Sequence, residues 1–465
     1  MIINHLKKFF GILIMLSPIL SLAQQTRPNV VIVMADDLDT RQLSCYGGKN
    51  LQTTNIDALA KEGMLFNDIY CSEAICIPTR ASLFTGVYPA RHGSYQNHKS
   101  VYPYFKSSVN QYLNNLGYKV GLTGKDHSTK PKSTFPFDII KGFEENCVSK
   151  TDDYFLDSIK NYITKDDKPF CLFVMSINPH APWTVGDPSK FNPEKLVLPP
   201  NWVDTKESRV EFCKYLAEVR RLDDQVGDIT KLLKETGKDK NTVVIFLGEQ
   251  GPQFPGGKWN SWNYGQKSSM IVRWPGTVKP MTTSNAIVQY EDITPTLIDI
   301  AGGKVIDSLD GNSFLKVIKQ ENKTHRDYAY GIYNNIPEGK AYPMRSIRDN
   351  DFKMILNLNS KDDYFLKYVM NPNGIVWASW TEKAKTSPEA QVLTNRIIKR
   401  PAVQFYDMKK DPYELNNLAD DSKYQAKIKD FKIKLAAWMK EQGDSGAAMD
   451  VEFGKQAKSK KEEGD

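Results

Sequence analysis

Cysteine and histidine are both scarce in this sequence, with six of each in 465 residues. The cysteines are scattered and form no Cys-x-x-Cys pair, and the histidines occur singly from His5 to His325. Small disulfide-stabilised domains use cysteine far more densely, and structural zinc sites need closely spaced Cys or His ligands. A disulfide framework and a zinc-finger module are therefore excluded, and one disulfide between unspecified cysteines is left open.

The sequence also lacks internal repeats and an apolar run long enough to cross a membrane. Its first apolar run, Phe9–Leu20, follows Lys7 and Lys8 and ends at Ser21-Leu22-Ala23, a small-x-small cleavage site. This pattern is typical of a secretory signal peptide over residues 1–23, and it predicts cleavage after Ala23 and a periplasmic or secreted protein. No cysteine follows the cleavage site directly, so we expect no membrane anchor.

A strong charge of either sign is absent as well. The formal net charge is +7, and it falls to +5 when the leader is removed, because the leader contains two lysines and no acidic residue. This small excess favours a polyanionic substrate without identifying one, and we expect no nucleic-acid partner.

With 40% hydrophobic and 25% charged residues, the chain has the composition of a globular protein with a large core. Short apolar runs alternate with helical stretches, which predicts an α/β fold with a mostly parallel sheet. Between Phe212 and Leu233, apolar residues recur every three or four positions and predict a helix that serves packing alone. Strands buried on both faces are expected at Val30–Met34, Val120–Thr123, Phe170–Ile177, Val243–Leu247 and Met270–Val272.

Beyond residue 335 the pattern changes to short strands rich in Tyr, Met and Ile. They are expected at Ala341–Asp349, Phe352–Asn357 and Gln404–Asp407, followed by a helix over Tyr424–Glu441. This pattern predicts a small antiparallel sheet with a helix. The expected organisation is a main domain over 28–335, a C-terminal subdomain over 336–450 and a disordered Lys/Glu/Gly/Ser-rich tail over 451–465.

Chemically active side chains follow four of the predicted strands. In parallel sheets, ligands bind beyond the carboxyl ends of the strands. Taken singly, each of these residues has a simpler explanation. A pair of aspartates most often forms a turn, a histidine is most often hydrogen-bonded within the fold, and a lysine is usually solvated. Their joint occurrence at strand ends favours a functional site. The residues are Asp36, Asp37, Lys125, His127, His180, Glu249, Gln250 and, a little later, Lys258.

The segment Cys76–Gly86 (CIPTRASLFTG) predicts a short helix with a reactive group at its start. Pro78 suits the first turn, where its missing N–H is not needed, and Gly86 suits the left-handed residue after the last turn. Cys76 is expected just ahead of the helix, where free N–H groups and the helix dipole favour an anion, and Arg80 adds positive charge. The alternative is a buried structural cysteine.

Cys-x-Pro-x-Arg followed by Ala-Ser-Leu-x-Thr-Gly resembles the signature of the type I sulfatases, of the alkaline-phosphatase-like superfamily. In that family a formylglycine-generating enzyme converts the cysteine to formylglycine, whose hydrate is the nucleophile. The resemblance implies a sandwich with a large, mostly parallel central sheet flanked by helices, and it identifies 28–335 as the catalytic domain.

Three further elements look like those of the same family: Gly124-Lys125-Asp126-His127, Pro179-His180-x-Pro182 and Gly257-Lys258-Trp259. The resemblance implies that Cys76 becomes formylglycine and that Arg80 and Lys125 support it. It further implies that His127 contacts the formylglycine hydroxyl and that His180 and Lys258 lie at the leaving oxygen.

The acidic and amide residues indicate calcium. Asp36, Asp37, Glu249 and Gln250 offer hard oxygen ligands, which calcium prefers and zinc does not. The resemblance implies one calcium ion bound by these side chains and the modified Cys76. Where the family usually has Asp followed by Asn or His, this chain has two residues that are each one methylene longer. We expect a backbone shift at Gly248 to compensate, and the alternative is that Glu249 points away and no metal site works.

These features predict a calcium-dependent formylglycine sulfatase that acts on a sulfated carbohydrate, either an algal polysaccharide or a glycosaminoglycan oligosaccharide. Trp183, Trp259 and Trp262 are expected to offer faces for stacking on sugar rings, although Trp183 and Trp262 fit a core equally well. The alternative is an arylsulfatase or an N-sulfoglucosamine-type sulfamidase. Remoter alternatives are a phosphatase or phosphodiesterase of the same superfamily and a non-catalytic glycan-binding descendant.

Overall fold

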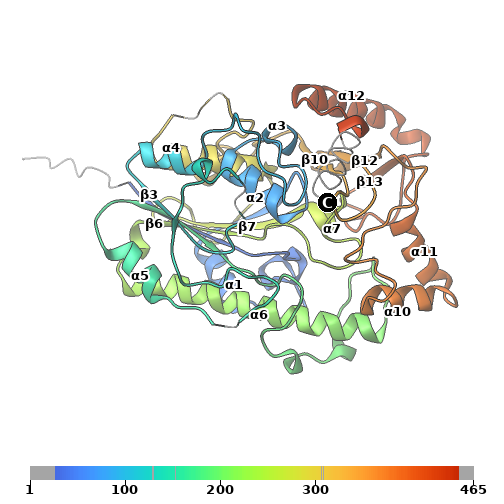
Figure 1. Ribbon diagram of the computed structural model, residues 1–465, viewed down its shortest axis with the longest axis horizontal. Helices are drawn as coiled ribbons and strands as arrows, with labels where there is room; N and C mark the ends of the chain where they lie inside the picture. The colour runs from blue at the N-terminus through green and yellow to red at the C-terminus, as the bar shows by residue number, and fades with distance from the viewer. Residues whose placement is uncertain (1–26, 128–129, 152, 305, 307, 450–465) are drawn as a thin grey trace, which may run out of the picture.

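The computed structural model describes residues 27–127, 130–151, 153–304, 306 and 308–449, which form two β-sheets surrounded by helices (Figure 1). The predicted leader and the predicted tail lie outside the described residues. The central sheet has nine strands. In spatial order they are β4 (Asp138–Ile139), β3 (Lys119–Gly124), β5 (Phe170–Met175), β1 (Asn29–Met34), β6 (Thr242–Leu247), β7 (Lys267–Arg273), β2 (Met64–Tyr70) and β8 (Thr282–Ser284), with β9 (Val288–Gln289) also paired to β2.

The strands β3, β5, β1 and β6 run parallel to one another, as the sequence predicts. All their residues are buried, because helices cover both faces of the sheet. Met34 at the end of β1 pairs with Met175 of β5 and with Leu247 of β6, and Gly124 of β3 also pairs with Met175. The four strands therefore end level, and the residues that follow them emerge at one edge.

The outer strands are only partly predicted by the sequence. β7 is predicted, but it runs antiparallel to β6 and β2. The sequence does not predict β2, because Asn67 and Asp68 interrupt its apolar run where its register with β7 shifts. β4, β8 and β9 have only two or three residues each, too few to give a periodic pattern.

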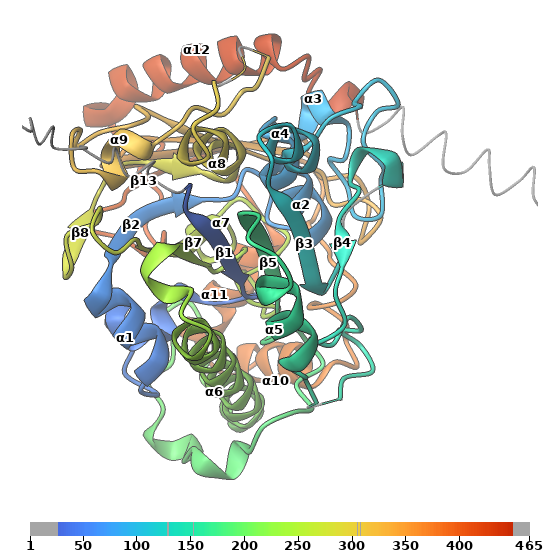
Figure 2. The ribbon, with the colours of Figure 1, turned by 90° about the vertical axis from the view of Figure 1, so that its left-hand side faces the viewer.

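Helices on the two faces of the central sheet enclose two separate cores (Figure 2). Successive side chains of a strand point to opposite faces, so Val31 and Val33 of β1 join one core and Val30 and Ile32 join the other. The first face is covered by α1 (Thr54–Glu62), α5 (Asp157–Thr164) and α6 (Lys206–Glu235), and the second by α2 (Cys76–Thr85), α4 (Val109–Asn115) and α8 (Ile293–Ile300). The short helices are α3 (Pro89–His92), α7 (Asn263–Gln266) and α9 (Leu315–Ile318).

The second sheet is antiparallel and has four strands. The strands are β10 (Ala329–Tyr333), β11 (Met344–Arg348), β12 (Phe352–Asn357) and β13 (Val403–Asp407). Helix α12 (Gln425–Glu441) packs on this sheet through Phe431, Leu435 and Trp438. The sequence predicts the last three strands and this helix but not β10, and the domain boundary near residue 335 stays a prediction.

Two helices that the sequence does not predict, α10 (Ile375–Ala384) and α11 (Pro388–Ile398), are inserted between β12 and β13. Helix α10 contacts α6 of the central domain (Figure 1). The insertion therefore brings part of the C-terminal region alongside the central sheet.

All six cysteines lie within the described residues and have free thiols, so no disulfide joins them. No helix in the described part of the chain is long and apolar enough to cross a membrane. The fold rests on its apolar cores rather than on covalent links.

Candidate active site

The level strand ends bring the predicted site residues together. The loops after the strands are tied to one another by backbone hydrogen bonds, in which the Asp36 N–H donates to Asn178 O (3.0 Å) and the Lys125 N–H donates to Met175 O (2.9 Å). The edge of the central sheet therefore gathers all the residues that the sequence singles out. They are Asp36, Asp37, Cys76, Arg80, Lys125, His127, His180, Glu249, Gln250 and Lys258.

Cys76 reaches this edge from helix α2. Ile75 is extended (φ −144°, ψ 140°), and the helix begins at Cys76 itself rather than after it, which corrects the prediction. Gly86 ends the helix with a left-handed φ of 70°, as expected. Because Cys76 is the first helical residue, its Sγ atom lies at the positive end of the helix dipole.

Polar groups surround the thiol of Cys76, a buried residue that is only 3% exposed. The Sγ atom lies 3.0 Å from Lys258 Nζ, 3.6 Å from Lys125 Nζ and 3.3 Å from Gln250 Nε2. Asp36 Oδ1 is 3.4 Å from Sγ. Burial, followed by the charge of Asp36, holds the pKa of this thiol well above its ordinary value. A thiol that stays protonated is a poor nucleophile, so the surroundings do not favour a cysteine mechanism.

Three buried ion pairs enclose the thiol, and each joins a cation to a carboxylate. They are Lys125 Nζ with Asp36 Oδ2 at 2.5 Å, Lys258 Nζ with Asp37 Oδ1 at 2.8 Å and Arg80 Nε with Glu249 Oε1 at 2.7 Å. The site therefore holds three basic and three acidic side chains around one sulfur atom.

The three carboxyl groups differ in their affinity for protons. Burial alone would raise the pKa of Asp36, but Lys125 holds it well below its ordinary value. Burial, with the neighbouring Asp36 charge, raises the pKa of Asp37. Burial raises the pKa of Glu249 to about 8 although Arg80 pairs with it. Carboxylates this deeply buried would be stabilised by further positive charge, which a metal ion supplies.

The dimensions of the group fit a calcium ion. Ligand atoms of Asp36, Asp37, Cys76 and His180 all lie within 4.8 Å of one another. Calcium takes oxygen ligands at about 2.3–2.6 Å, so two ligands on opposite sides of one ion are at most about 5 Å apart. Gln250 Oε1 is buried without a hydrogen-bond partner and is free to act as a ligand. Oxygen atoms of Asp36, Asp37 and Gln250 therefore suit a hard cation.

Glu249 is engaged with its neighbours. Its Oε1 accepts a hydrogen bond from Arg80, and its Oε2 accepts from the Asp37 N–H at 3.3 Å and from Gln250 Nε2 at 3.1 Å. Glu249 and Asp37 both have a φ of 64°, a left-handed conformation that costs a non-glycine residue about 1–3 kcal/mol and is kept where the surroundings impose it. Metal binding by Glu249 stays a prediction.

The two predicted histidines are both at this edge. His180 Nε2 lies 3.6 Å from Asp37 Oδ2, and its Nδ1 contacts the carbonyl oxygen of Ala181. Burial, followed by the charge of Lys125, keeps the pKa of His180 well below its ordinary value. The same two causes lower the pKa of His127 to about 2, and its Nδ1 is buried without a hydrogen-bond partner. Both rings are therefore neutral in the free protein.

Three residues that the sequence does not single out support the site. The Lys150 ammonium group donates to the His180 carbonyl oxygen and to Glu218 Oε2, and Glu218 Oε1 accepts a backbone hydrogen bond from the loop that follows His180. The Tyr215 hydroxyl donates to Asp37 O at 3.2 Å. Tyr215 and Glu218 belong to α6, so this helix does more than pack, contrary to the prediction. The sequence signal for the supporting role of α6 is Glu218, a carboxylate within the buried stripe of the helix. The sequence contains no such signal for Lys150.

Two of the tryptophans expected to face a substrate are buried. Trp259 is 3% exposed and Trp262 is 2% exposed, and only Trp183 is partly exposed. The loop after β6 folds inward, because the Trp259 N–H donates to Ala74 O at 3.0 Å and Trp262 packs under the guanidinium group of Arg396 at 3.9 Å. The stacking prediction is therefore wrong for Trp259, and Trp262 has the core position that was its alternative.

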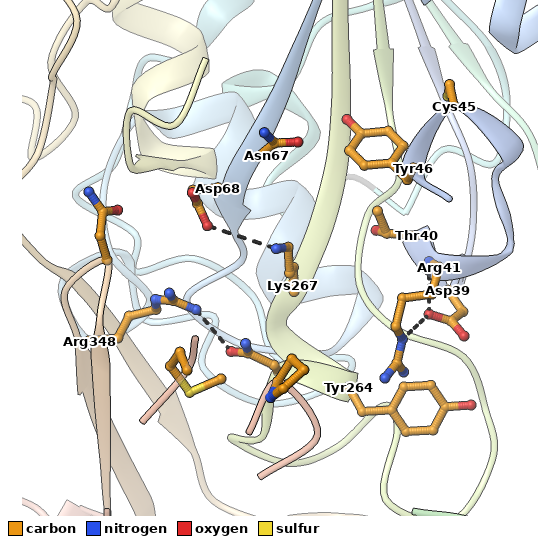
Figure 3. A pocket seen from close by; sticks show the side chains of 14 residues that line it. Asp39, Thr40, Arg41, Cys45, Tyr46, Asn67, Asp68, Tyr264, Lys267 and Arg348 are labelled. Atoms are coloured by element: carbon orange, nitrogen blue, oxygen red, sulfur yellow. Dashed lines mark hydrogen bonds and ion pairs between the residues drawn. The ribbon is translucent and has the colours of Figure 1, made fainter. Parts of the chain in front are cut away.

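The cavity drawn in Figure 3, with a volume of about 440 Å³, contains none of the predicted catalytic residues. It lies where residues of the central sheet meet residues of the second sheet. Its cationic groups have partners: Arg41 Nε with Asp39 Oδ1 at 2.9 Å, Lys267 Nζ with Asp68 Oδ1 at 3.8 Å and Arg348 Nη1 with Asn263 Oδ1 at 3.2 Å. The candidate catalytic side chains lie at the strand ends and not in this cavity.

An alkaline-phosphatase-like sheet with this cysteine, these lysines and these oxygen ligands at its edge defines a class of enzyme. The sequence model described as Sulfatase matches residues 28–303, and the chain belongs to the sulfatase family. A second model, described as the C-terminal part of N-sulphoglucosamine sulphohydrolase, matches residues 258–376. The family predicted from the Cys76 segment is thus confirmed.

The chain is similar to known sulfatases over most of its length. It is 34% identical to an ulvan-active sulfatase of Formosa agariphila over 91% of this chain and 82% of that protein. It is 26% identical to N-sulphoglucosamine sulphohydrolase of Homo sapiens over 92% of each chain. A solved structure described as a complex with D-glucosamine-2-N,6-O-disulfate superimposes with a TM-score of 0.71 at 23% identity, over 90% of this chain and 99% of that one. The predicted fold is confirmed.

Proposed function

We propose that this sulfatase hydrolyses sulfate groups on a saccharide, using a formylglycine made from Cys76 and one calcium ion. The observation that carries the proposal is the position of Cys76 Sγ, 3.0 Å from Lys258 Nζ and 3.6 Å from Lys125 Nζ at the start of α2. A sulfuryl group at this point would be surrounded by preorganised positive charge, which stabilises the charge that develops during its transfer.

Cys76 suits modification better than action as a thiol. Its raised pKa disfavours the thiolate, whereas a hydrated formylglycine supplies an oxygen nucleophile and later releases sulfate by re-forming its carbonyl. Because Cys76 is buried in the folded chain, we expect the formylglycine-generating enzyme to act before folding is complete. The leader over residues 1–23 supports export to the periplasm or the medium.

The side chains around Cys76 have distinct roles. Lys125 and Lys258 hold the sulfuryl oxygens, and Arg80 fixes Glu249 beneath them. The Nδ1–H of His180 donates to Ala181 O, so Nε2 is directed to the site and carries no proton in the free protein. His180 takes up a proton from solvent at Nε2 when the negatively charged ester binds, and it then gives this proton to the leaving oxygen. The negative charge that develops on the leaving oxygen raises the proton affinity of His180, which is low in the free protein.

Asp36, Asp37, Glu249 and Gln250 would hold the calcium ion. Bound calcium would polarise the sulfuryl group by withdrawing charge from its oxygens. Bound calcium would also keep Glu249 ionised despite its raised pKa, and the three cationic and three carboxylate side chains would then balance one another. The two positive charges of calcium would therefore match two negative charges, one on the sulfate monoester and one on the ionised nucleophile.

Saccharide substrates are supported by the relatives, whose names include an ulvan-active sulfatase and an N-sulphoglucosamine sulphohydrolase. The second of these and the C-terminal model over 258–376 favour a sulfamate as the alternative substrate. The test is sulfate release from a panel that contains sulfated algal and glycosaminoglycan oligosaccharides, an N-sulfated glucosamine, nitrophenyl sulfate and nitrophenyl phosphate. The proposal expects the saccharide esters to be turned over with the highest kcat/KM. Preference for the aryl sulfate, the sulfamate or the phosphate would replace it with the corresponding alternative.

A further inference from the structure

A second cavity, with a volume of about 350 Å³, opens directly beside the active site. Two of its walls are loops that carry predicted catalytic residues: 181–184 follows His180, and 253–255 lies between Gln250 and Lys258. The third wall is the segment 368–377 at the start of the α10 insertion. The cavity is therefore lined by the loops that carry the two residues assigned to the leaving oxygen, His180 and Lys258.

The active site also opens on this side. The His180 side chain is 14% exposed, whereas Asp36, Asp37 and Lys125 are fully buried. His127 is also partly exposed, so exposure alone does not fix the route of entry. Ala181, which directly follows His180, lines the cavity, so an alcohol held at His180 would lie next to it.

Tyr368 gives this cavity an aromatic face. Its ring stacks on Trp259 with centroids 5.4 Å apart and planes inclined by 24°, and Lys258 Nζ lies 4.8 Å from the Trp259 centroid. Tyr368 is nevertheless 52% exposed. Lys367 Nζ lies 4.9 Å from its ring centroid, so a sugar that stacks on this ring would have to displace a flexible lysine side chain. On the facing loop, Trp183 is stacked on Phe254 at 4.4 Å and is held rigid. An open ring on a fixed support suits stacking on the apolar face of a sugar.

The charged side chains that line the cavity are paired with each other. Its charged lining residues are Glu211 and Lys214 of α6, and these pair with each other at 2.6 Å. The polar side chains of Gln253 and Asn371 add hydrogen-bonding capacity. The cavity therefore suits hydroxyl groups and a ring face better than a second sulfate.

We propose that this cavity is the subsite for the sugar ring of the leaving alcohol and that Tyr368 is its stacking face. The inference rests on the proposed saccharide sulfatase function and adds which part of the chain recognises the sugar. It also gives the α10 insertion a role, because that insertion supplies the third wall.

Tyr368→Ala tests this proposal. Loss of an aromatic stacking face should raise the KM for a sulfated oligosaccharide about 10-fold with little change in kcat. The ratio of kcat/KM for the oligosaccharide to that for nitrophenyl sulfate should fall by the same factor, and Tyr368→Phe should restore it. Phe365→Ala is the matched control, because Phe365 is 46% exposed on the same segment and does not line the cavity. Thermal unfolding of both alanine variants verifies that the fold is intact.

The experiments distinguish failure of the subsite from failure of the proposed saccharide sulfatase function. An unchanged KM in Tyr368→Ala, or an equal loss on both substrates, would overturn the subsite while saccharide turnover by the unmodified chain still supports the function. No turnover of any sulfated saccharide by the unmodified chain would overturn both. An equal effect of Phe365→Ala would show that the segment, and not the Tyr368 ring, is responsible.

Discussion

Both sheets bury ion pairs, but the pairs at the edge of the central sheet surround a candidate nucleophile. Next to the second sheet, Arg345 binds both carboxylate oxygens of Asp444, at 2.5 Å and 2.8 Å, and both side chains are fully buried. At the edge of the central sheet, by contrast, three polar atoms are buried without a hydrogen-bond partner: Arg80 Nη2, His127 Nδ1 and Gln250 Oε1. Unpaired buried groups lower stability, and a ligand bound at this edge would complete their bonding. Asn357 Oδ1 in the second sheet also lacks a hydrogen-bond partner, so such atoms alone do not identify a ligand site.

The comparison shows that a buried charge does not by itself identify an active site. The Arg345–Asp444 pair joins β11 to the segment that follows α12, and it does not contact Cys76. The pairs of Asp36 and Asp37 converge on Cys76, where the ligands of a reaction would meet. Substitutions in the two regions should therefore separate turnover from stability.

The largest expected effect on turnover is that of Cys76→Ala. Removal of a catalytic nucleophile lowers kcat by about 10⁴-fold or more. Cys171→Ala is the control, because Cys171 is also fully buried but lies within β5 and away from the site. Steady-state sulfate release from both variants measures the difference, and substantial turnover by Cys76→Ala would contradict the assignment.

His180→Ala should lower turnover less. Loss of a general acid typically costs about 10²–10⁴-fold in rate, and the loss should be smaller for nitrophenyl sulfate, whose leaving group needs no proton. His92→Ala is a suitable control, because His92 is a buried histidine that hydrogen-bonds to Ser82 outside the site. Equal slowing of aryl and sugar sulfates by His180→Ala would mean that His180 binds sulfate rather than protonating the alcohol.

Calcium removal and Glu249→Ala test the metal site. A chelator should abolish turnover and added calcium should restore it, because Asp36, Asp37, Glu249 and Gln250 would share the ion. Loss of one ligand should weaken calcium binding at least about 10-fold. Calorimetric titration with calcium measures this directly. Unchanged affinity and turnover in Glu249→Ala would show that Glu249 serves only as the partner of Arg80.

Arg345→Met should have the smallest effect on turnover and a large effect on stability. It leaves Asp444 as an unpaired buried charge, which lowers the free energy of unfolding by about 3–5 kcal/mol. Denaturant titration measures that loss, and kcat/KM at a permissive temperature should stay within about twofold of the original. Loss of turnover without loss of stability would remove the distinction between the two regions.

The sequence predicts the inner strands and most of the site because both depend on local patterns. The continuous apolar runs of β1, β5 and β6 each identify a buried strand, and the residues after them must meet at one edge. The burial of Trp259 could not be predicted, because it depends on a loop hydrogen bond to Ala74. The same holds for Lys150, whose partner Glu218 is 68 residues away. Long-range contacts of irregular segments leave no periodic signal.

The chemical state of Cys76 tests the central claim most directly. Conversion of cysteine to formylglycine replaces CH₂SH by CHO, so the peptide that contains Cys76 should be lighter by about 18 Da. Mass spectrometry of the active protein, paired with its specific activity, should show that turnover rises in proportion to the modified fraction. A fully active preparation in which Cys76 is an unmodified thiol would contradict the account.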